Sequence, residues 1–133
     1  MAENGQTQYK ILIIEDNESS ADILKFILER EGYEVEVAVD GYAAEHLIAR
    51  TPAPDAVLLD VTLPYVDGFQ LMQTIRRTSA WKNVPVIMLS GHANGSFIEQ
   101  ARRVGADEYF VKPFRRNELI QCMQRFLPKQ VAA

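Results

Sequence analysis

The sequence predicts one α/β domain built on a doubly wound, five-stranded parallel sheet, and three observations lead to this fold class. Four short apolar runs are each bounded by polar residues, as in strands that are buried on both faces of a parallel sheet. A fifth segment alternates Val with Glu, and stretches with apolar residues at helical spacing separate the five segments. The length of 133 residues is also common for a single domain.

The first half of the chain is predicted to form three strands and two helices. Residues 9–14 form an apolar strand, and the helix between residues 16 and 32 starts with capping residues and ends at a glycine. In residues 33–39 Val alternates with Glu, which is typical of a strand with one wet face and places this strand at an edge of the sheet. Residues 40–49 form the next helix, and two prolines break the chain before the strand of residues 56–59.

The second half continues the alternation of strands and helices. An Asp-Gly pair opens the helix near residues 67–75, and the strand of residues 84–89 leads to a helix near residues 95–104 that again ends at a glycine. The strand of residues 108–111 leads to the last helix, near residues 116–127. The prediction is therefore five strand–helix pairs, (βα)₅, without internal repeats.

Composition and charge limit the location and the partners. The domain is expected to span residues 9–128, between a flexible segment of residues 1–8 and a tail of residues 129–133.

The net charge is −4 with no block of like charge, which argues against nucleic acid or a membrane as a partner. No apolar stretch approaches the roughly 20 residues of a membrane span, and the polar N-terminus has no signal region, so the expected location is the cytoplasm. The single cysteine, Cys122, excludes an internal disulfide and suits a reducing compartment.

Reactive side chains stand at the carboxyl ends of four predicted strands. Glu15 and Asp16 follow the first strand, Asp60 the third, Ser90 the fourth and Lys112 the fifth. Right-handed crossovers that cover both faces of the sheet require one reversal of winding, and with the second strand at an edge the order becomes 2-1-3-4-5. The reversal then falls between the first and third strands, at the rim where open α/β sheets bind ligands.

The side chains at this rim predict phosphoryl chemistry. Three carboxylates that meet would repel one another unless one is protonated or a cation joins them, and hard oxygen donors without His or Cys favour Mg²⁺, with Mn²⁺ as the alternative ion. Asp16 is assigned to bind the metal directly, and Glu15 directly or through a water. Asp60 projects alone from the middle of the sheet and is the candidate nucleophile, which would form an acyl phosphate. The Lys112 ammonium and the Ser90 hydroxyl would help to hold the phosphoryl group.

These residues lie in motifs that resemble the signature of the receiver domains of two-component response regulators, including single-domain chemotaxis regulators. The motifs are residues 11–16 (ILIIED), 58–60 (LLD), 63–64 (LP), 67–68 (DG), 89–90 (LS) and 112–114 (KPF). The resemblance covers about residues 10–127, and the motifs occur in the family's order. It implies the flavodoxin-like form of the doubly wound fold.

The resemblance also implies the reaction. Asp60 would accept a phosphoryl group from a phosphohistidine on a sensor histidine kinase or a histidine phosphotransfer protein. Asp16, Asp60 and the backbone carbonyl of Thr62 would ligate Mg²⁺, and Glu15, which stands where many members carry Asp, would assist directly or through a water. Such a protein is a phosphoacceptor that catalyses its own phosphorylation and dephosphorylation, and it differs from a conventional enzyme.

A switch is the second implication of the resemblance. Lys112 would pair with the phosphoryl group, and Ser90 would move to hydrogen-bond it. This movement would vacate space for Tyr109, which matches the family's aromatic switch position. The signal would pass through the surface of the fourth helix, fifth strand and fifth helix to a downstream protein or a second copy of the chain. The peptide bond between Lys112 and Pro113 is expected to be cis.

Five further residues are assigned either to the lifetime of the phosphorylated state or to the signalling surface. Thr62 and His92 stand two residues beyond the phosphoacceptor and the serine, at positions that flank the attacking water in this family, and would set the lifetime of the phosphorylated state. Phe97, Ile98 and Ile120 are candidates for the apolar part of the signalling surface, because helical spacing cannot direct every apolar residue of these helices inward.

Three alternative functions stand beside the receiver, and two of them require other residues at particular positions. A flavodoxin-like electron carrier needs a Ser/Thr/Gly-rich phosphate loop after the first strand, where this chain has residues 16–19 (DNES). A phosphatase of the haloacid dehalogenase type normally carries a second Asp two positions after its nucleophile, where Thr62 stands. The main alternative is a receiver-like scaffold that docks partners without phosphorylation, and the intact acidic residues, Ser90 and Lys112 argue against it. The pattern fits both a stand-alone regulator and a receiver within a longer protein.

Overall fold

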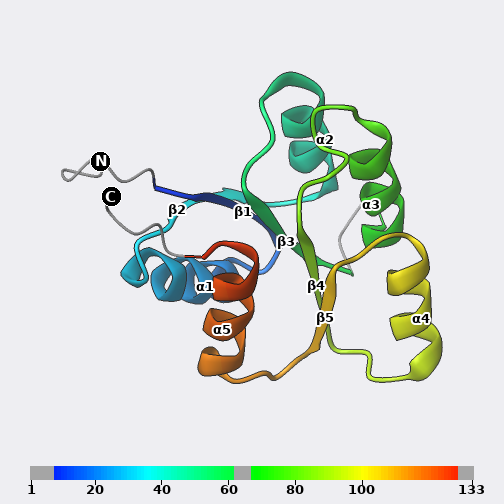
Figure 1. The fold of residues 1–133 in the computed structure, drawn as a ribbon. Coiled ribbons are helices and arrows are strands. Elements are labelled where there is room, and N and C mark those ends of the chain that lie inside the picture. Colours follow the sequence, from blue (N-terminus) through cyan, green and yellow to red (C-terminus); the bar gives the residue numbers. More distant parts are fainter. Residues whose placement is uncertain (1–7, 62–66, 129–133) are drawn as a thin grey trace.

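The computed structural model of the protein describes residues 8–61 and 67–128, and within these residues five strands and five helices alternate (Figure 1). The strands are β1 (Lys10–Ile14), β2 (Glu34–Ala38), β3 (Ala56–Asp60), β4 (Val86–Ser90) and β5 (Glu108–Val111). The helices are α1 (Glu18–Arg30), α2 (Gly41–Arg50), α3 (Gly68–Arg77), α4 (Gly95–Arg103) and α5 (Arg116–Phe126). The predicted elements are therefore present. Residues 1–7 and 129–133 lie outside the described residues, so the predicted flexible segment and tail stay predictions.

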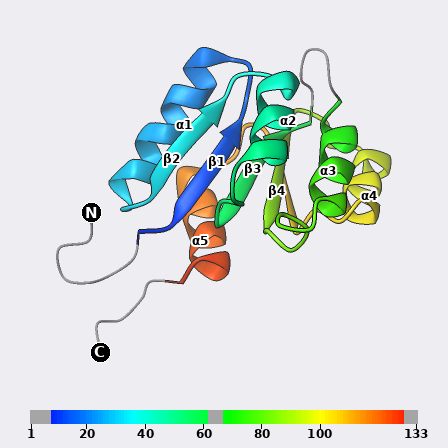
Figure 2. The same ribbon diagram turned by 90° about the horizontal axis from the view of Figure 1, so that it is seen from above.

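All strand pairs are parallel, and the order β2-β1-β3-β4-β5 confirms the predicted order. Helices α1 and α5 lie on one face of the sheet, and α2, α3 and α4 lie on the other (Figures 1 and 2). The edge strand β2 has only one buried residue, whereas every residue of β3 and β4 is buried. The alternation of Val and Glu in β2 follows from its position at the edge.

The core consists of two layers, one on each face of the sheet, because successive residues of a strand point to opposite faces. In β1, Ile11 and Ile13 pack with Leu24 and Leu28 of α1, while Leu12 and Ile14 belong to the layer under α2 and α3. The thiol of Cys122 is in the α1 and α5 layer with 1% exposure, and burial raises its pKa. Cys122 is thus a neutral core residue.

Short polar side chains start four of the helices. Asn17, Asp40, Asp67 and Asn94 each accept a hydrogen bond from a backbone N–H in the first turn of α1, α2, α3 and α4. Gly32 follows α1 with φ of 94°, a conformation that few other residues adopt. The described helices include none with the length and apolar character needed to cross a membrane.

Candidate functional site

The ends of β1 and β3 bring three carboxylates together at the carboxyl edge of the sheet. Glu15 and Asp16 follow β1, and Asp60 is the last residue of β3, which pairs directly with β1. One carboxylate oxygen of each residue lies within 4.8 Å of the others. Glu15 and Asp60 are buried, with 2% and 8% exposure, while Asp16 is exposed. The predicted acidic cluster is therefore present, and it opens to solvent on the side of Asp16.

Lys112 reaches this cluster from the end of β5. Its Nζ lies 3.1 Å from Oε1 of Glu15 and 3.4 Å from Oδ2 of Asp60. The lysine thus pairs with two acidic residues that are 97 and 52 positions away in the chain. The bond from Lys112 to Pro113 is cis, as expected.

The protonation of Glu15 and Lys112 depends on this contact. Burial raises the pKa of Glu15, the hydrogen bond with the Asp60 side chain and its negative charge raise it further, and donation from the Asn17 N–H and Lys112 opposes the rise. Burial lowers the pKa of Lys112, but attraction to Asp60 and Glu15 outweighs burial, and the net pKa is raised. The site therefore holds a firmly protonated lysine and a glutamate that gains a proton more readily than usual.

Ser90, at the end of β4, is buried beside this cluster with 1% exposure. Its carbonyl accepts a hydrogen bond from the Lys112 N–H (2.7 Å), and its Oγ accepts one from the His92 N–H (3.0 Å). The hydroxyl of Tyr109 in turn donates to the His92 carbonyl (3.0 Å). The two predicted switch residues, Ser90 and Tyr109, are thus joined through the backbone of His92.

The start of α3 packs directly on the end of β3. The Gly68 N–H donates to the Val61 carbonyl (3.0 Å), and Asp67 Oδ1 accepts from the Phe69 N–H (2.7 Å). A Cβ atom on Gly68 would lie 2.6 Å from the Val61 carbonyl oxygen and 2.9 Å from the Asp60 carbonyl oxygen. Only glycine permits this approach, which fixes α3 against the backbone of Asp60.

The expectations for Thr62 and for three apolar residues of α4 and α5 concern the surroundings of this site. Thr62 lies outside the described residues, so its carbonyl ligand and its contact with water stay predictions. Phe97, Ile98 and Ile120 are half-buried, and Phe97 packs against the core and stacks on His92. The sequence does not predict this contact, because an i, i+5 spacing between a loop residue and a helix residue has no characteristic pattern.

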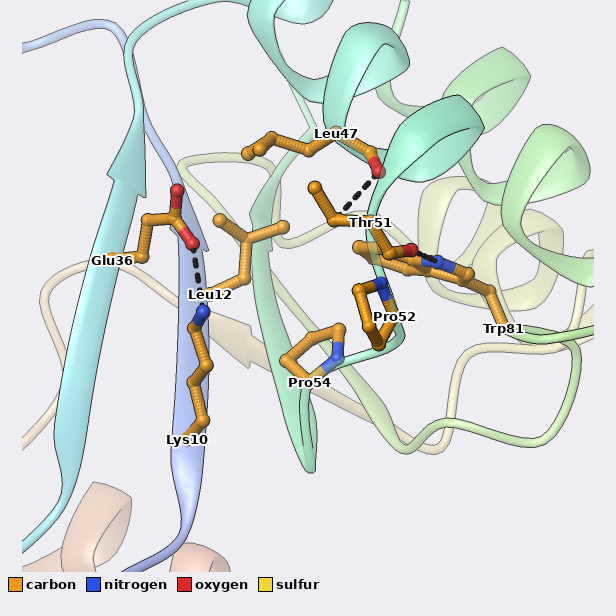
Figure 3. A pocket seen from close by; sticks show the side chains of 8 residues that line it. All are labelled: Lys10, Leu12, Glu36, Leu47, Thr51, Pro52, Pro54 and Trp81. Carbon is orange, nitrogen blue, oxygen red and sulfur yellow. Dashed lines mark hydrogen bonds and ion pairs between the residues drawn. The ribbon is translucent and has the colours of Figure 1, made fainter.

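A pocket toward the amino-terminal ends of the strands, away from the acidic cluster, is lined by none of these residues (Figure 3). It lies between the start of β1 and the segment that precedes β4. Lys10 Nζ is 3.2 Å from Glu36 Oε1, and Trp81 Nε1 donates a hydrogen bond to the Thr51 carbonyl (3.0 Å). Its polar groups are thus largely paired with one another, and the reactive groups gather at the carboxyl edge instead.

The donor set of the acidic cluster fits a hard divalent cation. Carboxylate oxygens are the ligands that Mg²⁺ prefers, and Mg²⁺ keeps several waters, which suits a cluster with one solvent-exposed member. The formal charge of three carboxylates and one ammonium is −2, which a divalent cation would neutralise.

Comparison with known proteins identifies the family. The model of the response regulator receiver domain matches residues 11–124. The chain is 35% identical to Protein PilG of Pseudomonas aeruginosa over 90% of this chain and 87% of PilG. It is 36% identical to the DNA-binding dual master transcriptional regulator RpaA of Synechocystis sp. over 89% of this chain, and it spans about half of RpaA (48%).

Solved structures show the same fold. The chemotaxis response regulator CheY4 of Vibrio cholerae superposes with a TM-score of 0.84 at 31% identity, covering 91% of this chain and all of that one (100%). The receiver domain of the sensor histidine kinase PA1611 of Pseudomonas aeruginosa PAO1 superposes with a TM-score of 0.82 at 32% identity, covering 90% and 98%. That receiver is described with a magnesium ion coordinated in its active site cleft.

Proposed function

The chain belongs to the response regulator receiver domain family, and we propose that it is phosphorylated on Asp60 in a metal-dependent reaction that alters the surface of α4, β5 and α5. One observation carries this proposal: Glu15, Asp16 and Asp60 meet within 4.8 Å, and Lys112 pairs with two of them. Carboxylate oxygens that suit a nucleophile and a cation, together with an ammonium group, thus lie at one rim, which supports the proposal.

Asp60 supplies the nucleophile for phosphoryl transfer. One of its carboxylate oxygens attacks the phosphorus of a phosphohistidine on a sensor histidine kinase or a histidine phosphotransfer protein. The O–P bond forms as the P–N bond breaks, and the leaving imidazole keeps the electron pair of that bond and takes a proton from solvent. The Lys112 ammonium, 3.4 Å from Asp60 Oδ2, places positive charge where the phosphoryl oxygens arrive.

The residues that would hold Mg²⁺, or Mn²⁺, are Asp16, Asp60 and the backbone carbonyl of Thr62. When bound, the ion supplies positive charge against the phosphoryl oxygens. Glu15 accepts hydrogen bonds on both oxygens, from Lys112 Nζ on Oε1 and from the Asn17 N–H on Oε2 (3.2 Å). These bonds favour contact between Glu15 and the metal through a water over direct ligation.

Ser90 and Tyr109 would pass the signal to the surface of α4, β5 and α5. The Ser90 Oγ accepts from the His92 N–H, which leaves the serine hydrogen to be donated to a phosphoryl oxygen. The partner on this surface would be a downstream protein or a second copy of the chain, in the cytoplasm, without direct contact to nucleic acid or membrane. Local charge at Asp60 would thus bias a two-state element.

Intact mass tests phosphorylation directly. The protein is incubated with Mg²⁺ and acetyl phosphate, beside an Asp60→Asn variant and an Asp55→Asn variant as a matched control. Asp55 accepts from the Lys10 N–H at the amino edge of the sheet, far along its strands from the rim. We expect one Mg²⁺-dependent phosphoryl adduct in the wild type and in Asp55→Asn, and none in Asp60→Asn. Absence of the adduct in the wild type, together with undetectable Mg²⁺ binding, would favour the scaffold function.

A further inference from the structure

His92 connects the two switch residues through its backbone. Its N–H donates to Oγ of Ser90, and its carbonyl accepts from the hydroxyl of Tyr109, each at 3.0 Å. Ser90 is buried and Tyr109 is half-buried, whereas His92 itself is exposed in the loop between β4 and α4. An exposed loop residue is therefore held from both sides by residues of two neighbouring strands.

The ring of His92 extends this connection to α4. It stacks on the ring of Phe97, with centroids 4.2 Å apart and planes inclined by 4°. Phe97 belongs to the first turn of α4, where its N–H donates to Oδ1 of Asn94 (2.9 Å). The Phe97 ring also lies 5.9 Å from the ring of Phe69 in α3, within the core layer on that face. A continuous series of contacts therefore runs from Ser90 through His92 to α4.

We propose that the stack of His92 on Phe97 couples Ser90 and Tyr109 to the first turn of α4, with His92 as a positioning residue. The inference rests on the proposed function, because phosphorylation supplies the signal. The Ser90 oxygen can keep the hydrogen bond from His92 while its own hydrogen is donated elsewhere, so the loop can follow a movement of Ser90. Since the imidazole is stacked on Phe97, the loop in turn moves the first turn of α4.

Stacking rather than acid–base chemistry is the role that this geometry gives the imidazole. Aromatic pairs prefer offset-stacked or edge-to-face arrangements at centroid distances of about 4.5–7 Å, and the stacked pair of His92 and Phe97, at 4.2 Å, is slightly closer than this range. A phenyl ring at position 92 would keep the stack and lose the titratable nitrogens. The variants His92→Ala and His92→Phe therefore separate the two roles.

Amide hydrogen exchange in the unphosphorylated protein tests the coupling by itself. We expect His92→Ala to speed exchange of the Phe97 N–H roughly two- to tenfold, and Phe97→Ala to speed exchange of the His92 N–H by a similar factor. His92→Phe should restore the wild-type rate. Ile98→Ala is the matched control, because it removes a half-buried apolar side chain from the same turn outside the stack. Unchanged exchange in Phe97→Ala, or equal effects of His92→Ala and His92→Phe, would overturn the proposal.

The same variants are then compared after treatment with acetyl phosphate and Mg²⁺. In protein whose phosphoryl mass is confirmed during the measurement, we expect phosphorylation to change exchange in the first turn of α4 in the wild type, His92→Phe and Ile98→Ala, and to leave it unchanged in His92→Ala. A full change in His92→Ala would overturn the coupling. If the wild type gains no phosphoryl mass, the proposed function fails, and the comparison in the unphosphorylated protein still decides the coupling.

Discussion

Whether Gly68→Ala raises or lowers the stability of the protein depends on one contact between α3 and the end of β3. By helix propensity alone, Gly68→Ala in the first turn of α3 would stabilise the protein by about 0.5–1 kcal/mol. The added Cβ, however, would lie 2.6 Å from the Val61 oxygen, 2.7 Å from the Val61 Cα and 2.9 Å from the Asp60 oxygen. All three atoms belong to the backbone, so no side-chain rotation relieves the contact.

The size of the effect follows from the distance to be made up. Ordinary van der Waals contact starts near 3.4 Å, so α3 and the end of β3 must separate by about 0.8 Å from the present 2.6 Å. Overpacking of this kind costs about 1–3 kcal/mol, and after the gain in propensity we expect a net loss of about 1–2 kcal/mol. The separation also moves the backbone of Asp60, and a shift approaching 1 Å slows a positioned reaction up to about 100-fold.

Urea unfolding and the rate of phosphorylation by acetyl phosphate measure the two effects. Gly95→Ala is the matched control, because Gly95 also begins a helix and a Cβ there meets nothing within 4 Å. We expect a lower urea midpoint and slower phosphorylation for Gly68→Ala, with Gly95→Ala unchanged or slightly stabilised. Equal midpoints and rates for the two variants would show that the contact with Val61 is not restrictive and would refute the reasoning.

Three further predictions follow from the ion pairs. The pKa of Glu15 is raised in the folded protein, so its contribution to stability is present below its ordinary value of 4.5 and is lost as the pH rises through the raised value. In urea titrations the metal-free wild type should therefore lose stability relative to Glu15→Gln as the pH rises above 4.5. Glu15→Gln should also weaken Mg²⁺ binding about tenfold or more by calorimetry, and equal affinity would exclude Glu15 from the metal site. The Arg76 guanidinium donates hydrogen bonds to the carbonyls of three residues and to the Asp107 side chain. Arg76→Lys should therefore lower the free energy of unfolding by about 1–3 kcal/mol. For the control Arg77→Lys, at an exposed position, the change in the free energy of unfolding should stay within about 0.5 kcal/mol.

The fold could be predicted from the sequence because its periodic signals are strong. The strands β1, β3 and β4 are almost fully buried and appear as continuous apolar runs, and the edge strand β2 shows the alternation expected of partial exposure. The expectation of full burial is wrong for β5, which is only half-buried because it forms the other edge of the sheet. Right-handed crossovers then leave few ways to arrange five strands with one at an edge. Residue bounds were less exact: β4 begins two residues later than predicted and includes Ser90.

The sequence predicts the part of the site that lies at the ends of strands, and it does not predict the contacts made by the loop after β4 and by α3. Parallel strands bring their carboxyl ends to one rim, so Glu15, Asp16 and Asp60 were predicted to meet without knowledge of any distance. The stack of His92 on Phe97 and the close approach of Gly68 depend on how a loop and a helix settle on the sheet. Such contacts are set by the packing of side chains and backbone atoms that have no period in the sequence.

Under the proposed function, the charges at the rim give phosphorylation a way to act on β4 and β5 together. In the resting site Lys112 is shared between Glu15 and Asp60, at 3.1 and 3.4 Å. An acyl phosphate on Asp60 would carry about one more negative charge than the carboxylate, and its oxygens would lie farther out than Oδ2. Lys112 would then follow the phosphoryl oxygens, and Glu15 would lose part of the donation that opposes its raised pKa.

Backbone contacts would carry such a movement away from the rim. The Lys112 N–H donates to the Ser90 carbonyl at 2.7 Å, so a shift at the end of β5 would act on the residue whose hydroxyl is proposed to donate to the phosphoryl group. Ser90 is joined in turn to His92 by the bond to its Oγ. A single added charge would therefore act on both strand ends and on the loop that leads to α4, because the ion pair and the hydrogen bonds share Lys112 and Ser90 as common members.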